Sequence, residues 1–271
     1  MPESHLLSDR VRIEIADGVA DVRLWRPDKL NALDQAMFDG LMAAADQLSG
    51  TPGLRAVVLS GEGRSFCAGL DINDLAAQQI GPEGIKAMLQ PAEGQLANRF
   101  QRVAYDWKQL PVPVIAALRG HVFGGGLQIA LGADIRYAAP DARLSVMEIQ
   151  WGIIPDMAGS QTLRDLVRID IARELTYSGR RIDAEEAARI GLVTRLCEDP
   201  LAEALSTATA IASRNPDAIR AAKQLFNQAW HGDEAEGLAL ERQLQTNLLG
   251  SPNQMEAVMA GIQNRPARFQ D

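Results

Sequence analysis

Three consecutive glycines near the middle of the chain constrain its fold more than any other feature of the sequence. The glycines at 124–126 follow an aliphatic run at 112–118 and precede an apolar run at 127–131, which ends at Gly132. This order predicts a buried strand, a backbone turn that side chains would block, and a short helix. A helix that begins in bare glycines leaves its first N–H groups free, and the helix dipole adds partial positive charge there. The sequence therefore predicts a binding site for a negatively charged oxygen.

A second glycine-rich loop repeats this arrangement earlier in the chain. The apolar run at 56–59 is a predicted buried strand that leads into the loop GEGRSFCAGLD at 61–71, after which a helical pattern resumes. In open α/β layers, ligands bind at the carboxyl ends of strands. We therefore expect the two loops to lie side by side, with two backbone N–H groups directed at one atom.

Periodic patterns along the chain predict an α/β body and a helical tail. Residues 11–15 and 19–24 alternate around Asp17-Gly18, which is typical of a β-hairpin at a sheet edge. Asp34 is a good N-cap for the helix that follows it. The remaining predicted elements are one or two helices at 83–110, helices at 161–167, 169–177 and 183–189, a strand at 193–197, and three or four amphipathic helices broken at 215–216, 232–233 and 251–252.

We place the boundary between body and tail near residue 200. Residues 1–199 are then the α/β core that carries the glycine loops, and residues 200–271 are a helical C-terminal domain. Short helices with apolar faces need a surface to pack on, so a neighbouring subunit is the expected partner of this tail.

Composition narrows the range of partners. The chain has 271 residues, a net charge of −8 and a pI near 5.0, which argues against nucleic acid or an anionic membrane as the main partner. No apolar run approaches the length that spans a bilayer, and the first residues lack a signal-peptide core, so we expect a cytoplasmic protein. Cys67 and Cys197 are expected to be free thiols. Three histidines and two cysteines at wide spacing predict no metal cluster.

Four segments resemble the signatures of one known family. SFCAGLD at 65–71, GHVFGGGLQIALGADIRYA at 120–138 and EIQWGIIPDMAG at 148–159 are similar to those of the crotonase, or enoyl-CoA hydratase/isomerase, superfamily. RPDKLNAL at 26–33 is similar to that family's first CoA-contacting loop. The resemblance implies a ββα spiral followed by helices that assemble trimers, often paired into hexamers. It also implies an acyl-CoA substrate and no separate cofactor or metal.

The resemblance assigns an oxyanion hole to two backbone N–H groups. One belongs to Leu70 and the other to Gly125, the middle glycine of the triplet. Removing a proton beside a thioester carbonyl leaves an enolate, whose oxygen must meet preorganised donors. Losing one such donor typically costs on the order of 10²–10³ in rate.

The resemblance also points to the carboxylates that would move the proton. Hydratases of the family use two glutamates, and the corresponding positions here are Gln128 and Glu148. Asp156 falls where the family's dienoyl-CoA isomerases carry a second carboxylate. Gln128 is expected either to line the pocket or to hold a water, and Asp156 is either catalytic or a turn residue. His121, next to Val122 on an apparent strand, is expected to be structural.

Three functions remain open at this point. The first is an enoyl-CoA or dienoyl-CoA isomerase, in which Glu148 moves a proton along the acyl chain with help from Asp156. The second is a hydratase in which Gln128 and Glu148 share one water. The third is a catalytically silent CoA-binding protein.

The CoA moiety brings phosphate charges to an acidic protein, so basic side chains must meet it. Arg64 stands where hydratases of the family often place a lysine, Lys29 and Leu30 belong to the first CoA loop, and Arg265 resembles the basic C-terminal segment that reaches a neighbouring subunit's CoA. By the same resemblance, the backbone of Ala68, Asp71 and Ile72 lines the adenine pocket.

Overall fold

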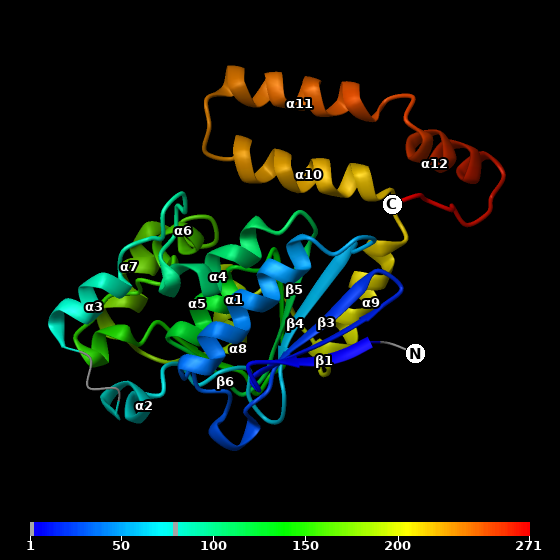
Figure 1. Cartoon of the computed structure of the whole chain (residues 1–271). Helices are drawn as coiled ribbons and strands as arrows, with labels where there is room; N and C mark the ends of the chain where they lie inside the picture. Colours follow the sequence, from blue (N-terminus) through cyan, green and yellow to red (C-terminus); the bar gives the residue numbers. More distant parts are fainter. Residues whose placement is uncertain (1–2, 78–80) are drawn as a thin grey trace.

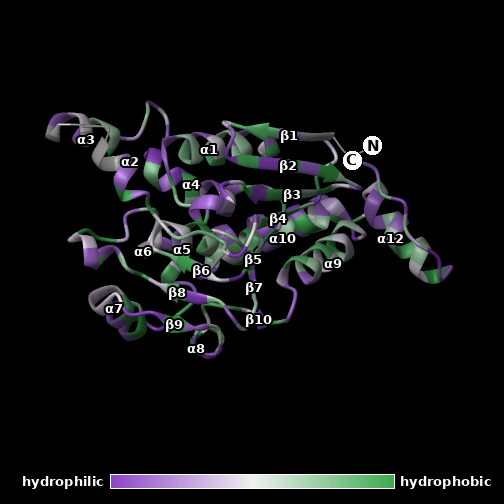
Figure 2. Cartoon of the chain, turned by 90° about the horizontal axis from the view of Figure 1, so that it is seen from below, coloured by the Kyte–Doolittle hydropathy of each residue, from purple (hydrophilic) through white to green (hydrophobic). Residues whose placement is uncertain are grey.

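A sheet of seven strands forms the centre of the computed structural model, which describes residues 3–77 and 81–271. In spatial order the strands are β1 (Glu3–Leu7), β2 (Val11–Ala16), β3 (Val19–Leu24), β4 (Ala56–Gly61), β5 (Val114–Leu118), β7 (Ile135–Ala138) and β10 (Arg195–Leu196). The first three strands are antiparallel and the rest run parallel to β3. Figure 2 shows the strands in this order, from β1 to β10.

Helices cover both faces of this sheet, because successive side chains of a strand point to opposite faces. Val57 and Leu59 of β4 belong to the larger core, together with α1 (Gln35–Ser49), α4 (Arg99–Gln109) and α5 (Gly125–Leu131). Ala56 and Val58 face the other way, against the small side chains of α9 (Pro200–Ala212). In Figure 1, α1 and α9 lie on opposite sides of the strands.

A smaller sheet joins the two glycine loops. It consists of β6 (His121–Phe123), β8 (Arg143–Ser145) and β9 (Ile182–Asp183). Cys67 forms an isolated parallel bridge to Val122 of β6. Backbone hydrogen bonds thereby fix the loop at 61–71 to the segment that leads into the glycine triplet. The two loops lie side by side, as expected from the sequence. Together the two sheets and their helices form the mixed α/β architecture expected for the crotonase fold.

The remaining helices flank the body or extend from it. The flanking ones are η1 (Pro27–Lys29), α2 (Ile72–Ala77), α3 (Pro82–Met88), η2 (Glu148–Trp151), α6 (Gly159–Leu163), α7 (Ile169–Ser178) and α8 (Ala184–Ile190). The tail continues after α9 with α10 (Pro216–Ala229), α11 (Glu234–Leu248) and α12 (Pro252–Ile262). Figure 1 shows α10 and α11 as an antiparallel pair along one side of the molecule, with α12 beyond the pair. The division at residue 200 stays a prediction. The first helix of the predicted C-terminal domain, α9, packs on the sheet.

Several sequence-based expectations are confirmed in detail, and others need correction. The hairpin of β2 and β3 forms, but it is not the sheet edge because β1, which the sequence patterns missed, pairs outside β2. The strand expected at 193–197 shrinks to β10, since the Val193 N–H is used in closing α8 on the Ala187 carbonyl. Asp34 caps α1 through the Met37 N–H as expected. Cys67 and Cys197 are free thiols.

The part of the chain that the structure describes contains no helix long and apolar enough to cross a bilayer.

Candidate active site

The glycine triplet lies against the other glycine loop so closely that side chains would collide there. Gly124 has a φ of +51°, which L side chains rarely adopt, and a Cβ on Gly126 would come 2.6 Å from the Cβ of Cys67. Gly69 has a φ of +92°, and a Cβ there would lie 2.9 Å from the Phe123 carbonyl oxygen. The two loops therefore meet backbone to backbone, in the way that a shared pair of N–H donors requires.

The Leu70 N–H is turned away from its neighbouring strand segment. The Leu33 N–H donates to the Gly69 carbonyl (2.8 Å) and the Asp71 N–H donates to the Leu33 carbonyl (3.0 Å), so the bonds of this bridge belong to the residues on either side of Leu70. Among the described residues, neither the Leu70 nor the Gly125 N–H donates to a protein acceptor. Both groups predicted for the oxyanion hole are thus free donors on adjoining loops, and their catalytic role stays a prediction.

Glu148 begins η2 and points its carboxylate at the glycine triplet. A Cβ on Gly124 would lie 3.4 Å from Glu148 Oε1. The residue is only 5 % exposed, Oε1 accepts from Gln128 Nε2 at 2.6 Å, and the buried Oε2 has no hydrogen-bond partner within the described chain. Burial raises the pKa of Glu148, and the charge of Asp156 raises it further. A buried carboxylate oxygen without a partner is costly, which favours a functional role over a structural one.

Gln128 holds Glu148 in place and is more than inert pocket lining. Its Oε1 accepts from the Met157 N–H (2.9 Å) and the Gly159 N–H (3.0 Å), which fixes the amide so that Nε2 faces Glu148. The amide therefore links α5, η2 and the turn before α6. Its carbonyl oxygen already has two donors and is not free to accept from a water.

Asp156 lies in the turn that Gln128 fixes, close enough to Glu148 for their charges to interact. The side chain is half-buried, and burial raises its pKa. Two carboxylates with raised pKa values therefore approach the same site, one on η2 and one on the turn before α6. The catalytic role of Asp156 stays a prediction.

Most of the residues expected to bind CoA lie on the segment 26–33 and the loop 61–71, which contact each other. Leu30 has a φ of +52°, and its carbonyl accepts from the Ala68 N–H at 3.0 Å. Because the Ala68 and Asp71 N–H groups are already used within the protein, neither is free to donate to an adenine ring. Ile72 begins α2 directly after this loop.

The basic residues expected to meet CoA differ in their surroundings. Lys29 and Arg64 are exposed, and neither forms an ion pair within residues 3–77 and 81–271. Arg265 instead forms a two-pronged ion pair with Glu256 of α12, at 2.6 and 2.8 Å. Figure 1 shows α12 far from α2, so Arg265 does not reach the site of its own chain. Its predicted contact would have to be with a neighbouring subunit.

Two residues of the site were missed in the sequence. Asn31 is fully buried and donates from Nδ2 to three carbonyls of the 62–66 loop, and Arg26 forms an ion pair with Asp71. Both lie in the segment RPDKLNAL, which was recognised as a motif, but the sequence does not show which residues these side chains bind. From the sequence we also expect helices around residues 78–109 to line the acyl pocket, and residues 78–80 of this stretch lie outside those that the structure describes.

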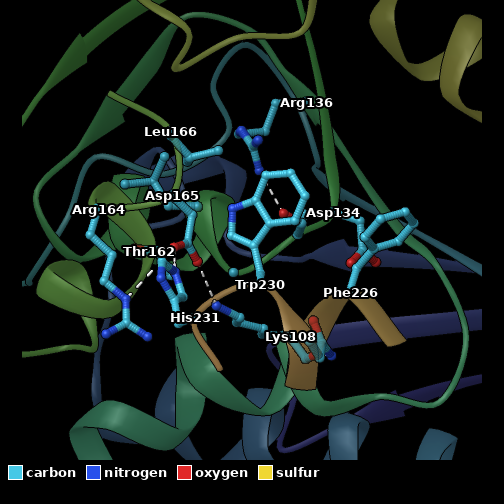
Figure 3. A pocket seen from close by; sticks show the side chains of 14 residues that line it. Lys108, Asp134, Arg136, Thr162, Arg164, Asp165, Leu166, Phe226, Trp230 and His231 are labelled. Atoms are coloured by element: carbon cyan, nitrogen blue, oxygen red, sulfur yellow. Dashed lines mark hydrogen bonds and ion pairs between the residues drawn. The ribbon is translucent and has the colours of Figure 1, made fainter. Parts of the chain in front are cut away.

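A pocket of about 370 Å³ lies at the opposite end of α5 and is separate from this site. In Figure 3 the carboxylate of Asp165 faces Lys108, at 2.8 Å, and His231 at the end of α10. The contact of His231 holds the end of α10 against the segment after α6, and the Lys108 pair ties that segment to α4. The pocket thus marks a junction between body and tail.

Comparisons with known proteins agree with the geometry. The family model described as "Enoyl-CoA hydratase/isomerase" matches residues 14–271. A probable enoyl-CoA hydratase of Mycobacterium bovis is 33% identical over 96% of this chain and 98% of its own length. The mitochondrial methylglutaconyl-CoA hydratase of Mus musculus is 31% identical over 93% of this chain and 79% of its own. The crystal structure of an enoyl-CoA hydratase from Bacillus anthracis superposes with a TM-score of 0.88 at 30% identity, covering 96% of this chain and 98% of that one.

Proposed function

This chain belongs to the enoyl-CoA hydratase/isomerase family, and we propose that it moves a carbon–carbon double bond within an enoyl-CoA or dienoyl-CoA thioester. The observation that carries the proposal is the pairing of Glu148 with Gln128. One buried carboxylate presents a free Oε2, and the neighbouring side chain is an amide locked as a hydrogen-bond donor. An amide cannot exchange protons, so a single carboxylate has to both remove and return the proton.

The proposed reaction on a 3-enoyl-CoA is a balanced proton shift. Glu148 Oε2 takes a proton from C2, and the electron pair of the broken C–H bond spreads into a dienolate. The negative oxygen lies between the Leu70 and Gly125 N–H groups, whose fixed dipoles need no reorganisation. The Glu148 carboxylic acid then gives the proton to C4, and the product is a 2-enoyl-CoA.

Asp156 extends the same scheme to a longer conjugated system. With two acids near the acyl chain, a proton taken by one carboxylate at one end of a dienoyl-CoA is matched by a proton given by the other at the far end. The raised pKa values of Glu148 and Asp156 support this, because a general acid or base works best with a pKa near the operating pH.

Hydration is the second candidate, and the names of the relatives favour it. The M. bovis and M. musculus relatives are both named as hydratases. In this mechanism the Nε2–H of Gln128 that does not face Glu148 would donate to a water. Glu148 Oε2 would take a proton from that water as its oxygen adds to C3, and Glu148 would then give the proton to C2. Gln128 Oε1 would take no part, since it already accepts two backbone N–H groups.

Product analysis on a panel of acyl-CoA thioesters distinguishes these reactions. We expect 3-enoyl-CoA or 3,5-dienoyl-CoA to give an isomer of unchanged mass, with no turnover by the Glu148→Gln variant. Rapid conversion of a trans-2-enoyl-CoA to a product heavier by one water would instead establish the hydratase. CoA binding without turnover of any thioester would identify a silent CoA-binding protein.

We further propose that the chain assembles as a trimer or a dimer of trimers. The tail carries large apolar side chains that the rest of the described chain leaves exposed: Phe226, Trp230, Leu238, Leu249, Met255, Val258, Met259 and Ile262. Such a surface is typical of a subunit interface. Sedimentation equilibrium measures the assembly directly, and a monomer at micromolar concentration would contradict it.

A further inference from the structure

Arg26 connects the start of α1 to the loop that carries Leu70. Its Nη1 donates to Asp71 Oδ2 at 2.9 Å and to the Ala32 carbonyl at 3.0 Å, and its Nε lies 3.3 Å from Asp34 Oδ2. All three charged side chains are largely shielded from solvent. Ion pairs of this kind, made through several nitrogens and partly buried, hold geometry better than exposed ones.

The segment 26–34 binds the first part of the 62–71 loop. Asn31 donates from Nδ2 to the carbonyls of Glu62 (3.0 Å), Ser65 (2.8 Å) and Phe66 (3.1 Å), while its Oδ1 accepts from the Arg26 N–H at 2.8 Å. Asn31 does not contact the other end of the loop, at 70–71, which is held by the Leu33 backbone and by Arg26.

Leu70 lies between these two fixed points. The Gly69 carbonyl, which shares the peptide plane of the Leu70 N–H, accepts from the Leu33 N–H, and the Asp71 N–H of the next peptide donates to the Leu33 carbonyl. Arg26 holds the Asp71 side chain, so the backbone of Leu70 between these bonds has little freedom to rotate. Hydrogen bonds weaken steeply as their angle departs from linear, so a small rotation of this peptide would weaken the donor.

We infer that Arg26 is a positioning residue, which aims the Leu70 N–H at the enolate oxygen by holding Asp71. The inference rests on the oxyanion hole of the proposed function. It does not depend on whether the enzyme shifts a double bond or adds water, because both reactions need the donor.

The chain offers a matched control for this inference. Arg10 also pairs with Asp34, its Nε lying 2.9 Å from Oδ2, but it makes no contact with Asp71. Arg10→Gln therefore removes an ion pair from the same carboxylate and leaves the Leu70 loop untouched. Arg26→Gln removes both links, and Arg26→Lys keeps the charge while losing the planar geometry that bridges two carboxylates.

The direct readout is the enolate of a bound 3-oxoacyl-CoA, which absorbs in the near ultraviolet more strongly than the keto form. A working oxyanion hole raises the enolate fraction, and this measurement needs no turnover. We expect Arg26→Gln to lower both the keto–enolate equilibrium constant of the bound ligand and kcat by about 10- to 100-fold. This is less than the 10²–10³-fold typical of losing a donor outright. KM and the calorimetric affinity for CoA should change by less than about threefold. Arg26→Lys should recover part of the loss, and Arg10→Gln should match the wild type.

The alternative outcomes are distinct. An unchanged enolate signal in Arg26→Gln, or a loss confined to CoA affinity, would overturn the positioning role. Failure of the wild-type enzyme to bind the enolate form would overturn the proposed oxyanion hole itself. If Arg26→Gln does not fold, Asp71→Asn breaks the same pair from its other side and must show the same loss of enolate, or the inference fails.

Discussion

Glu148 is deeply buried, and its Oε2 has no hydrogen-bond partner in the described chain, so its charge costs stability. Because burial raises its folded-state pKa, the folded protein binds this proton more tightly than the unfolded chain does. The stabilising contribution of the protonated group is complete below the unfolded pKa, near 4.3, and is lost as the pH rises through the folded pKa. The wild-type protein therefore bears the cost of an ionised, buried carboxylate at any pH above the folded pKa.

The first prediction is that Glu148→Gln lowers turnover by about 10²–10⁴-fold and raises the melting temperature at pH 7.5. The gain in melting temperature should shrink toward pH 4.5. Glu256→Gln is the control of opposite sign, because Arg265 holds the pKa of Glu256 at about 2 and its removal should lower stability at neutral pH. Thermal unfolding at several pH values checks both signs, and a destabilised Glu148→Gln protein would contradict the account.

The pH dependence of catalysis gives a second prediction at this scale. A base must be ionised, so kcat/KM should rise with pH through the pKa of Glu148, with a midpoint above 4.5. Burial is the largest cause of the shift and the Asp156 charge a lesser one, so Asp156→Asn should move the midpoint down without returning it to 4.5. A pH profile of each protein measures the two midpoints. An identical midpoint in both would show that Asp156 does not act on Glu148.

Gln128 offers a third residue-scale prediction. Gln128→Glu keeps the acceptor that the Met157 and Gly159 N–H groups need, and it adds a second ionisable group beside Glu148. A proton shared by the two carboxyl groups can then activate and deliver water. We expect hydration of a trans-2-enoyl-CoA to increase at least about tenfold over the wild type, within the range of general acid–base effects. Mass spectrometry of the product checks this, and Gln128→Met, which cannot exchange protons, should show no increase.

Among the contacts between elements, the packing of α5 on the 67–70 loop sets how close the two predicted backbone donors lie. A Cβ on Gly126 would lie 2.6 Å from Cys67 Cβ and 2.7 Å from its carbonyl oxygen, so the helix must move away from the loop. Gly126→Ala should cost about 1–3 kcal/mol of unfolding free energy and reduce turnover more than CoA binding. Gly261→Ala in α12 is the control, since nothing lies within 4 Å of its added Cβ, and it should be neutral or stabilising. Urea denaturation and steady-state kinetics of both variants decide the matter.

Elements whose signals are local were predictable from the sequence, and those that depend on distant partners were not. The glycine triplet, the Asp34 cap and the hairpin of β2 and β3 each carry their cause within a few residues. A strand at His121 was expected, but β8 and β9 of the smaller sheet are three and two residues long and depend on distant partners, so no periodicity in the sequence indicates them.

The same distinction applies to the site. Glu148 and the two backbone donors could be predicted because they lie at fixed positions within motifs, and their roles stay predictions. The bonds from Met157 and Gly159 to Gln128 span 29 and 31 residues, and the ion pair of Arg26 with Asp71 spans 45. Only the folded chain brings these groups together, so the residues that support the site escaped sequence reasoning.

For the whole molecule, one buried lysine is a main link between α10 and the body. Lys223 of α10 reaches under α4, where Nζ donates to the Val112 carbonyl (2.8 Å) and to Asp134 Oδ2 (2.8 Å). Burial lowers the pKa of Lys223, although Asp134 opposes this shift. Asp134 and the Val112 carbonyl would lose this partner if Lys223 were truncated, and a broken buried pair is costly.

We therefore predict that Lys223→Met loosens α10 and everything beyond it from the body. The loss of unfolding free energy should be about 2–4 kcal/mol, somewhat under the usual figure for a broken buried pair because Asp134 is 30% exposed. Since the tail carries the exposed apolar side chains, the same change should weaken the proposed assembly and shift sedimentation toward monomer. Arg168→Gln removes an ion pair between two exposed side chains and should leave both measurements unchanged. If Lys223→Met kept the assembly and the stability of the wild type, Lys223 would not anchor α10, and other contacts would hold it, among them those of Arg220 with the Leu54 carbonyl and of Asn227 with the Lys108 carbonyl.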